Sequence, residues 1–163
     1  MLNNSEYNTL IKLYSDGLYR YILKANSNPA EAQDIVQNVF LQLWEKRDQI
    51  KVETAKSLLY KMAYQNMIDI YRSEKARQQR EVMPEPESVN PSAQYGSREL
   101  LDQAFDLLKP EEKNIILLRD YEGYTYDEIS EMLNRPLSSI KVGLYRARKK
   151  MQHHLLILEN EVR

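Results

Sequence analysis

The sequence contains no cysteine, which excludes disulfide bonds, thiol catalysis and zinc sites built from thiolates. Only 4 of its 163 residues are glycine, too few for a glycine-rich phosphate loop or for an all-β fold with many turns. No apolar run reaches the roughly 18 residues that a transmembrane helix needs. The opening segment, MLNNSEYNTL, lacks the basic start and apolar core of a signal peptide. We therefore expect a cytoplasmic protein with no stable insertion in a membrane.

Side chains for catalysis or metal binding are also scarce. The only two histidines, His153 and His154, are adjacent, and adjacent side chains on a helix point about 100° apart. No second cluster of ligands lies near them in the sequence. We therefore expect neither an enzyme nor a bound metal or other cofactor.

Charge is balanced over the whole chain but unevenly distributed along it. The 23 basic and 24 acidic side chains give a formal net charge of −1, which excludes a uniformly basic surface but allows a local basic patch. The stretch EVMPEPESVNPSAQYGS carries three of the six prolines, several acids and no hydrophobic period. It predicts a flexible acidic linker over residues 81–97, between domains at 1–80 and 98–163. The alternative is a long loop within one domain, although such loops are uncommon.

Helical periodicity predicts three helices in the N-terminal domain. The first runs from about residue 4 to 26. The second begins after the N-cap Asn28, with Pro29 at its first position and Glu31 where the acid of a capping box belongs. The third begins near Thr54 and ends in the charged run RSEKARQQR. The apolar stripe of the second helix, which should face the core, consists of Ala32, Ile35, Val36, Val39, Phe40 and Leu43.

Four shorter helices are predicted in the C-terminal domain. They cover about 99–108, about 110–121, the segment DEISEMLN with its capping box, and a last helix from near Ser138 to beyond Met151. A tight break at Asn134-Arg135-Pro136 separates the helix DEISEMLN from the last helix. The last helix is basic, and two short helices joined by such a turn are typical of a helix-turn-helix. The predicted fold class is therefore all-α: a three-helix domain and a four-helix domain with a helix-turn-helix, joined by a flexible linker.

The last helix carries a basic face. On a wheel at about 100° per residue, Ile140, Leu144, Ala147 and Met151 fall together and should face the core. The opposite side presents cations, hydroxyl groups and an aromatic ring, which suit phosphates and base edges. The alternative is a solvated basic face near a helix C-terminus, where cations are favourable in any case. With the turn before the helix, the candidate DNA-binding residues are Arg135, Ser138, Ser139, Lys141, Val142, Tyr145, Arg146 and Lys149.

One face of the second helix lies away from its predicted core stripe. Leu41 lies opposite that stripe, Asp34 and Gln37 flank it, and Trp44 borders it. An exposed leucine and tryptophan framed by polar side chains suggest a protein-binding surface. A single stray exposed leucine is the alternative.

A face of the third helix combines aromatic and cationic side chains. Rings stack on bases while cations follow the backbone, so this mixture is typical of a surface for single-stranded nucleic acid. The alternative is that the tyrosines pack against the first helix. The face consists of Tyr60, Tyr64, Met67 and Tyr71, with Lys61 and Arg72 beside it.

The segments AQDIVQNVFLQLWEK, LLYKMAYQNMIDIYRSEK and YEGYTYDEISEMLNRPLSSIKVGLYRARKKM together resemble an extracytoplasmic-function (ECF) sigma factor of bacterial RNA polymerase, in the sigma-70 family. The resemblance covers the family's region 2 on roughly residues 5–80, a linker, and its region 4 on roughly 98–155. It implies a protein that is not itself an enzyme but gives RNA polymerase its promoter specificity. The implied partners are core polymerase, through its β′ clamp helices and β subunit, promoter DNA, and an anti-sigma factor.

The resemblance also implies a role for each face. The last helix would read the −35 element as duplex DNA. The second helix would dock on the β′ clamp helices through Asp34, Gln37, Leu41 and Trp44. The third helix, with the loop at about 49–53 before it, would bind the melted −10 element and a flipped base through Tyr60, Lys61, Tyr64, Gln65, Asn66, Tyr71 and Arg72.

The chain departs from the family's usual pattern at three places. The alanine-x-asparagine of the third helix is Ala63-Tyr64-Gln65 here, with Asn66 displaced by one, so the amide of the base pocket could be Gln65. A tryptophan common near the start of that helix is Leu58. Gly143 stands where an arginine is frequent, which removes one contact and costs the helix about 1 kcal/mol relative to alanine. We expect Gly143→Arg to strengthen DNA binding.

The alternative from another functional class is a stand-alone helix-turn-helix regulator. Such a protein would need a dimer interface to read two half-sites, and the N-terminal helices offer no heptad seam for one. The mass of the native protein in solution separates the two hypotheses, because the regulator would be a dimer.

Overall fold

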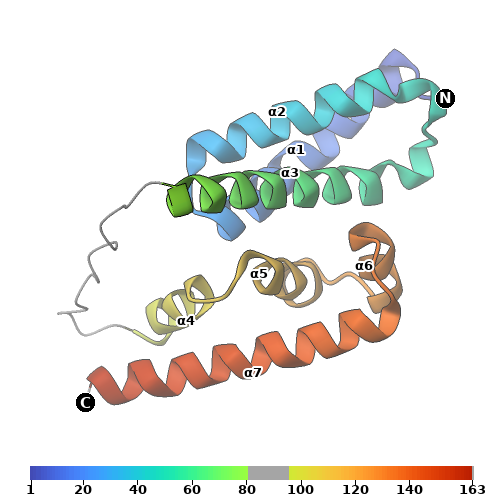
Figure 1. Ribbon diagram of the computed structural model, residues 1–163. Coiled ribbons are helices and arrows are strands. Elements are labelled where there is room, and N and C mark those ends of the chain that lie inside the picture. Colours follow the sequence, from blue (N-terminus) through green and yellow to red (C-terminus); the bar gives the residue numbers. More distant parts are fainter. Residues whose placement is uncertain (81–95, 163) are drawn as a thin grey trace.

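Helices make up all the regular structure of the described residues. The computed structural model describes residues 1–80 and 96–162, here called the N-terminal half and the C-terminal half (Figure 1). The N-terminal half contains α1 (Asn4–Asn26), α2 (Pro29–Glu45), a 3₁₀ turn η1 (Arg47–Gln49) and α3 (Val52–Arg80). The C-terminal half contains α4 (Ser97–Asp106), α5 (Pro110–Ile116), a π-helical turn η2 (Leu117–Tyr121), α6 (Tyr126–Leu133) and α7 (Leu137–Val162). The prediction of an all-α fold is confirmed.

Side-chain caps set the boundary between α1 and α2. α1 begins with a capping box in which the Glu6 N–H donates to Asn3 Oδ1 at 2.8 Å and the Asn3 N–H donates to Glu6 Oε2 at 3.0 Å. It ends at Ser27, whose left-handed φ of 59° cannot continue a helix. Asn28 then caps α2, as predicted, by accepting a hydrogen bond from the Glu31 N–H at 3.2 Å.

The three helices of the N-terminal half, α1, α2 and α3, pack against one another as a bundle. The predicted core stripe of α2 is buried except for Val36, which is half-buried. α3 begins at Val52, two residues before the predicted start at Thr54. The reason is that the Thr54 hydroxyl donates to the Lys51 carbonyl at 3.0 Å and so lies inside the first turn instead of capping it.

The helix-turn-helix predicted in the C-terminal half is formed by α6, a tight turn and α7. The capping box of α6 has the Glu128 N–H donating to Thr125 Oγ1 at 3.1 Å and the Thr125 N–H donating to Glu128 Oε2 at 2.8 Å. Asn134 ends α6 with a left-handed φ of 51°. The single helix predicted over 110–121 is instead α5 followed by the π-helical turn η2.

The linker predicted over residues 81–97 falls mostly on residues 81–95, which lie outside the described residues. Its last part is helical, because α4 already begins at Ser97. An exposed glycine, Gly96, is the residue before that helix.

The two halves meet along one seam. α5 and α6 lie between α3 and α7, so α7 forms the outer edge of the C-terminal half (Figure 1). Contacts across the seam join α3 to α5 and α6, and α1 to α5. Buried apolar side chains from both halves form one continuous cluster. The halves are therefore packed on each other over the described residues, which the sequence did not predict.

α7 passes close to α5 at Gly143. A Cβ atom at this position would lie 2.9 Å from Ile115 Cδ1 and 3.5 Å from Arg135 Nη2. Ile115 is buried, so its methyl group has little free space to move into. Gly143 thus belongs to the packing surface of α7, and a side chain at this position would start toward Ile115 and not toward the outer face. The stronger DNA binding expected of Gly143→Arg stays a prediction.

We predict that Gly143→Ala fails to gain the roughly 1 kcal/mol that alanine normally adds to a helix, because its methyl group collides with Ile115. Ile115→Val removes the Cδ1 atom concerned. In that background we expect Gly143→Ala to be about 1 kcal/mol more favourable than in the native chain. Urea denaturation of the four chains measures this coupling, and strictly additive effects would show that no collision exists.

Candidate functional site

The outer face of α7 carries the groups predicted to contact duplex DNA. Its inner side is buried at Ile140, Leu144 and Ala147, and Met151 is half-buried, so the helical wheel is confirmed. This apolar back fixes the orientation of the helix on α4, α5 and α6. The opposite side exposes Ser138, Lys141, Val142, Tyr145, Arg146 and Lys149.

The five cations of α7 fall into two groups, according to whether they form an ion pair within the described residues. Arg148 donates from Nε to Asp120 Oδ2 at 3.1 Å, and Lys150 Nζ lies 2.9 Å from Glu112 Oε2. These two cations neutralise acids within the C-terminal half. No ion pair with a residue of 1–80 or 96–162 is formed by the other three, which are Lys141, Arg146 and Lys149. The outer face therefore presents uncompensated positive charge, which phosphates attract.

The turn before α7 holds Arg135 in a fixed position. Its guanidinium donates to Ser139 Oγ from Nη2 at 2.8 Å and from Nε at 3.2 Å. Its carbonyl accepts a hydrogen bond from the Ser130 hydroxyl. Ser139 was predicted to contact DNA, and in this structure its oxygen is engaged by Arg135.

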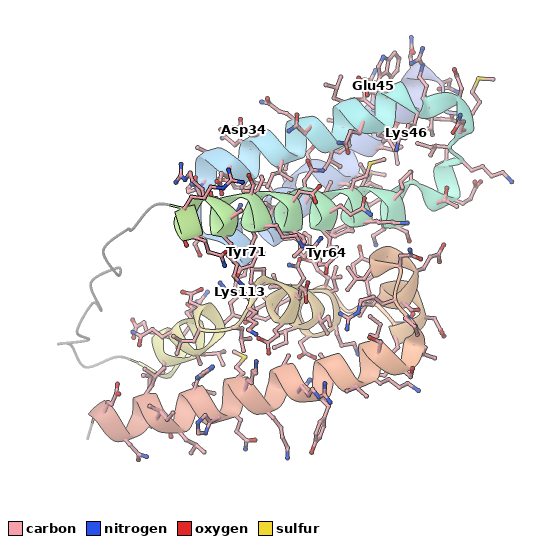
Figure 2. The ribbon with its side chains drawn as sticks, viewed as in Figure 1. Asp34, Glu45, Lys46, Tyr64, Tyr71 and Lys113 are labelled. Atoms are coloured by element: carbon pink, nitrogen blue, oxygen red, sulfur yellow. The ribbon has the colours of Figure 1, made fainter. Side chains whose placement is uncertain are left out.

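The surface of α2 that was predicted to bind a protein is open. Leu41 is 54% exposed, and Asp34 and Gln37 are exposed beside it. Figure 2 shows Asp34 on the side of α2 away from α3. Trp44 is half-buried, with its ring 4.9 Å from that of Tyr7. The placement of Leu41 opposite the core stripe is confirmed.

The aromatic face of α3 is covered by the C-terminal half. Tyr60 is 3% exposed and Met67 is 6% exposed, so the prediction that these two lie on an open face is wrong. Figure 2 shows Tyr64 and Tyr71 on the side of α3 that faces α5 and Lys113. Tyr64 is half-buried, while Tyr71 keeps 39% of its surface exposed. Burial here comes from helices distant in sequence, which a helical wheel of α3 alone does not reveal.

The polar side chains on this part of α3 differ in their access to solvent and in their hydrogen bonds. Gln65 is exposed, whereas Asn66 is half-buried and donates from Nδ2 to the Met62 carbonyl at 2.7 Å. Gln65 is therefore the more accessible of the two amides. Lys61 is half-buried, and Arg72 Nη2 lies 3.9 Å from Glu111 Oε1 of α5.

Tyrosine rings and a buried hydrogen bond join the two halves. The Tyr60 ring lies 5.3 Å from the ring of Tyr21 on α1 and 5.3 Å from that of Tyr124, which precedes α6. The Tyr21 hydroxyl donates to Asn114 Oδ1, and Asn114 Nδ2 donates to the Pro110 carbonyl at 2.7 Å. Tyr21 and Asn114 are both buried, so their polar groups find partners inside the protein instead of in water. Tyr60 thus packs on the first helix, as the alternative interpretation had it.

A cleft of about 600 Å³ lies in the seam. It brings together side chains that were predicted to contact two different DNA elements. From α3 these are Tyr64, Gln65 and Arg72, and from the turn before α7 it is Arg135.

Sequence reasoning missed Asn114, Tyr21 and Tyr124 as residues of the seam. The one available signal was Asn114, a polar residue followed directly by the apolar run IILL in a predicted helix. Periodicity indicates that such a position is buried but does not identify the partner.

Within the described ranges, no helix combines the length and apolar character required to cross a bilayer. The same ranges hold no group of three histidine, aspartate or glutamate side chains placed to bind a metal ion.

Two family models match the chain. Sigma-70 region 2 matches residues 10–77, and sigma-70 region 4 matches residues 98–151. The ECF RNA polymerase sigma factor SigE of Mycolicibacterium smegmatis is 25% identical over 91% of this chain, which spans 61% of that protein's length. RNA polymerase sigma factor YlaC of Bacillus subtilis is 23% identical, with 100% of this chain and 99% of YlaC covered.

A solved structure with a similar fold is the sigma factor RpoE in complex with the anti-sigma factor NepR from Bartonella quintana. Its TM-score is 0.74 at 21% identity, and the match covers 93% of this chain and 97% of that one.

Burial of the tyrosines makes the fold sensitive to alkali. Desolvation raises the pKa of Tyr60 to about 12, and it also raises the pKa of Tyr21 and of Tyr124 above the usual value. The stability that these hydroxyls contribute is complete below the unfolded pKa of about 10. It is lost as the pH rises through the folded pKa, because the unfolded chain gives up its protons first.

We therefore predict that the free energy of unfolding falls between about pH 10 and pH 12, and that Tyr60→Phe makes this fall less steep. Denaturant unfolding at several alkaline pH values, followed by circular dichroism, measures the slope. An equal slope for Tyr60→Phe and the native chain would show that Tyr60 titrates as if it were exposed.

Proposed function

The chain belongs to the sigma-70 family and is a sigma factor of the ECF type, which directs core RNA polymerase to promoters, and on this premise we propose which surface performs each task. Residues 1–80 act as region 2 and bind core polymerase and the −10 element. Residues 98–163 act as region 4 and bind the −35 element, with 81–97 as the connection.

The division of cations on α7 is the observation that carries this proposal. Cations near a helix C-terminus are favourable without any ligand, but α7 continues to Val162 and has no basic residue in its last turn, so that explanation does not apply to its cations. Arg148 and Lys150 are instead paired with acids within the fold. Lys141, Arg146 and Lys149 share the outer face with Tyr145 and are engaged in no ion pair with a described residue. In a major groove these cations would contact phosphates and base edges, while Tyr145 packs on a thymine methyl group or a sugar.

We assign the open face of α2 to core polymerase. An exposed leucine next to a half-buried tryptophan, with a polar rim of Asp34 and Gln37, has the composition of a protein-binding hot spot. Leu41 and Trp44 would be its apolar centre, on the β′ clamp helices. Contacts of the C-terminal half with the β subunit follow from family membership.

We assign the aromatic face of α3 to the melted −10 strand. Tyr64 and Tyr71 would stack on bases, Lys61 and Arg72 would follow the backbone, and Gln65 would bond a base edge. Asn66 is held by its own helix. Tyr60 joins this surface only where the C-terminal half is displaced, because it is buried in the seam.

The protein performs no chemistry of its own in this proposal, since RNA synthesis belongs to the polymerase, and it works in the cytoplasm beside that enzyme. An anti-sigma factor is proposed as a further partner. Two proteins of similar fold, RpoE with NepR and CnrH with the cytosolic domain of CnrY, were solved as complexes of this kind.

The direct test is capture of core RNA polymerase by the full chain, followed by run-off transcription on genomic fragments. We predict that Leu41→Asp lowers the affinity for core polymerase about tenfold or more, because a charge replaces the apolar centre of the contact. Its melting temperature should change little, since Leu41 is 54% exposed.

Leu13→Asp is the matched control for that change. Leu13 is 64% exposed on α1, so it tests the effect of a new surface charge outside the α2 face. Equal losses of affinity in both variants, or a large loss of stability in Leu41→Asp, would contradict the assignment of α2.

For α7 we predict different effects from two exposed cations. Arg146→Ala should cost about 1–3 kcal/mol of affinity for its preferred −35 sequence and relax the preference at one position. Lys149→Ala should weaken binding to all sequences alike and reduce the salt slope by about one. Holoenzyme binding to a −35 library at two salt concentrations measures both, with Lys12→Ala on α1 as the control. Unchanged affinity and slope in both variants would mean that this face is only solvated.

A further inference from the structure

We propose that Tyr126 and Tyr145 are positioning residues for DNA binding, and that each ring holds one lysine of the outer face of α7 in the orientation that meets a backbone phosphate. Tyr126 holds Lys141, and Tyr145 holds Lys149. The inference rests on the function proposed for α7 above. It adds a residue of α6 to the DNA-binding groups, and it gives Tyr145 a second task besides its own contact with DNA.

The first observation is that both lysines lie over aromatic rings. Lys149 Nζ lies 5.0 Å from the centre of the Tyr145 ring, and Lys141 Nζ lies 5.9 Å from the centre of the Tyr126 ring. A cation within about 6 Å of a ring centre is attracted by the negative charge of the ring face. Neither lysine forms an ion pair with a described residue, so within the described ranges the ring is the group that orients each charge.

The second observation is that the pairing is selective. Lys141 and Lys149 lie one turn of α7 before Tyr145 and one turn after it, so their spacing alone would allow either lysine on that ring. Among the described residues, Tyr145 is paired with Lys149, whereas Lys141 lies over a ring from another helix. The reason is that side chains on a helix lean toward its N-terminus, which brings Lys149 back over Tyr145 and carries Lys141 away from it.

The third observation is that the Tyr126 ring is itself fixed. It is half-buried at the first position of α6 and packs against the apolar core. Arg119 Cζ lies 4.5 Å from the centre of this ring, and Arg119 Nη1 donates to the Tyr124 carbonyl at 2.9 Å. Lys141 therefore lies over a ring that the fold holds in place.

The two lysines bracket the residues that would read base edges. Val142, Tyr145 and Arg146 lie between Lys141 and Lys149 in the sequence and are exposed on the same outer face. From the first lysine to the second, α7 rises about 12 Å, which is about the width of the major groove. The lysines can therefore reach phosphates on the two sides of the groove while the residues between them face the bases.

Holding a lysine in advance matters because its side chain is long. A free lysine loses rotamer freedom when it binds a phosphate, and that loss opposes binding. A lysine that already lies over a ring has lost part of this freedom before DNA arrives. The ring therefore raises the affinity for all sequences alike, while the number of phosphate contacts, and with it the salt slope, stays the same.

Double-mutant cycles on holoenzyme binding to the −35 library test the pairing. We expect Tyr145→Leu to cost about threefold more affinity in the native chain than in Lys149→Ala, and the same in the native chain as in Lys141→Ala. Any contact of Tyr145 with DNA itself is lost in every background and cancels. The salt slope of Tyr145→Leu should match that of the native chain, and Tyr145→Phe, which keeps the ring, should keep the coupling to Lys149.

Tyr126→Leu should show the opposite pairing. Its effect should depend on Lys141→Ala and be independent of Lys149→Ala. Because Tyr126 is half-buried, the melting temperature of this variant is measured first. If Tyr126→Leu does not fold, the Tyr145 cycles decide the proposal, since Tyr145 is 60% exposed and its replacement leaves the core intact.

The second readout is nuclear magnetic resonance of the full chain without DNA. The ring current of Tyr145 should shift the ε-methylene protons of Lys149 upfield relative to those of Lys12, which is exposed on α1. The shift should disappear in Tyr145→Leu and persist in Tyr145→Phe and in Lys141→Ala. A ring with a purely structural role would not move this signal.

An equal cost of Tyr145→Leu in the native, Lys141→Ala and Lys149→Ala backgrounds would overturn the positioning role, and so would a Lys149 signal that Tyr145→Leu leaves in place. Failure of the proposed function looks different. In that case Lys141→Ala and Lys149→Ala would bind DNA as tightly as the native chain, while the Lys149 signal would still depend on Tyr145. That result would overturn the DNA-binding assignment of α7 and the positioning role together.

Discussion

The hydrogen bond from the Tyr21 hydroxyl to Asn114 Oδ1 determines how the two halves of the molecule meet. Asn114 is the one polar residue that is fully buried among those the structure describes, and a buried amide without partners costs on the order of 1–3 kcal/mol. α5 can therefore lie on α1 only where this amide is satisfied. With α5 so placed, α6 packs on α3 and Tyr124 reaches Tyr60. The cover over the aromatic face of α3 follows from this one constraint.

α7 has an apolar inner side that packs on the C-terminal half and a charged outer side. Its apolar back, at Ile140, Leu144 and Ala147, seals the C-terminal half, and its lateral cations Arg148 and Lys150 pair with acids of η2 and α5. What remains on the outside is a short set of cations around Tyr145 that form no ion pair with any residue the structure describes. The inner side of α7 carries apolar side chains and the cations lie on its other sides, because burying an unpaired charge costs free energy.

The features that were predicted correctly from the sequence are those that depend on neighbouring residues within one helix. The N-cap at Asn28, the capping box of α6, the break at Asn134, the wheel of α7 and the exposure of Leu41 all follow from local patterns, and all are found in the structure. The capping box expected at Glu31 is not formed, because the Asn28 N–H donates to Asn26 Oδ1 at 3.2 Å and not to the Glu31 carboxylate. What failed depends on contacts between distant segments. The wheel of α3 placed Tyr60 and Met67 outside the bundle, which is correct for α1–α3 alone but not once α5 and α6 are added. Gly143 was counted as a weak helix former, whereas its position is set by the approach of Ile115.

The chemistry of tyrosine explains how the aromatic face of α3 is covered by the C-terminal half. A tyrosine ring is flat and apolar with a polar tip, so it packs equally well against another tyrosine or against a base. A surface built to stack on unpaired bases is therefore also a good surface for Tyr124, unless charge or shape prevents it. The charged groups do not prevent it here, because Arg72 faces Glu111 and Lys56 lies 4.9 Å from the centre of the Tyr124 ring. The seam thus uses ring–ring and cation–ring contacts, which are the kinds of interaction that also hold single-stranded nucleic acid on proteins.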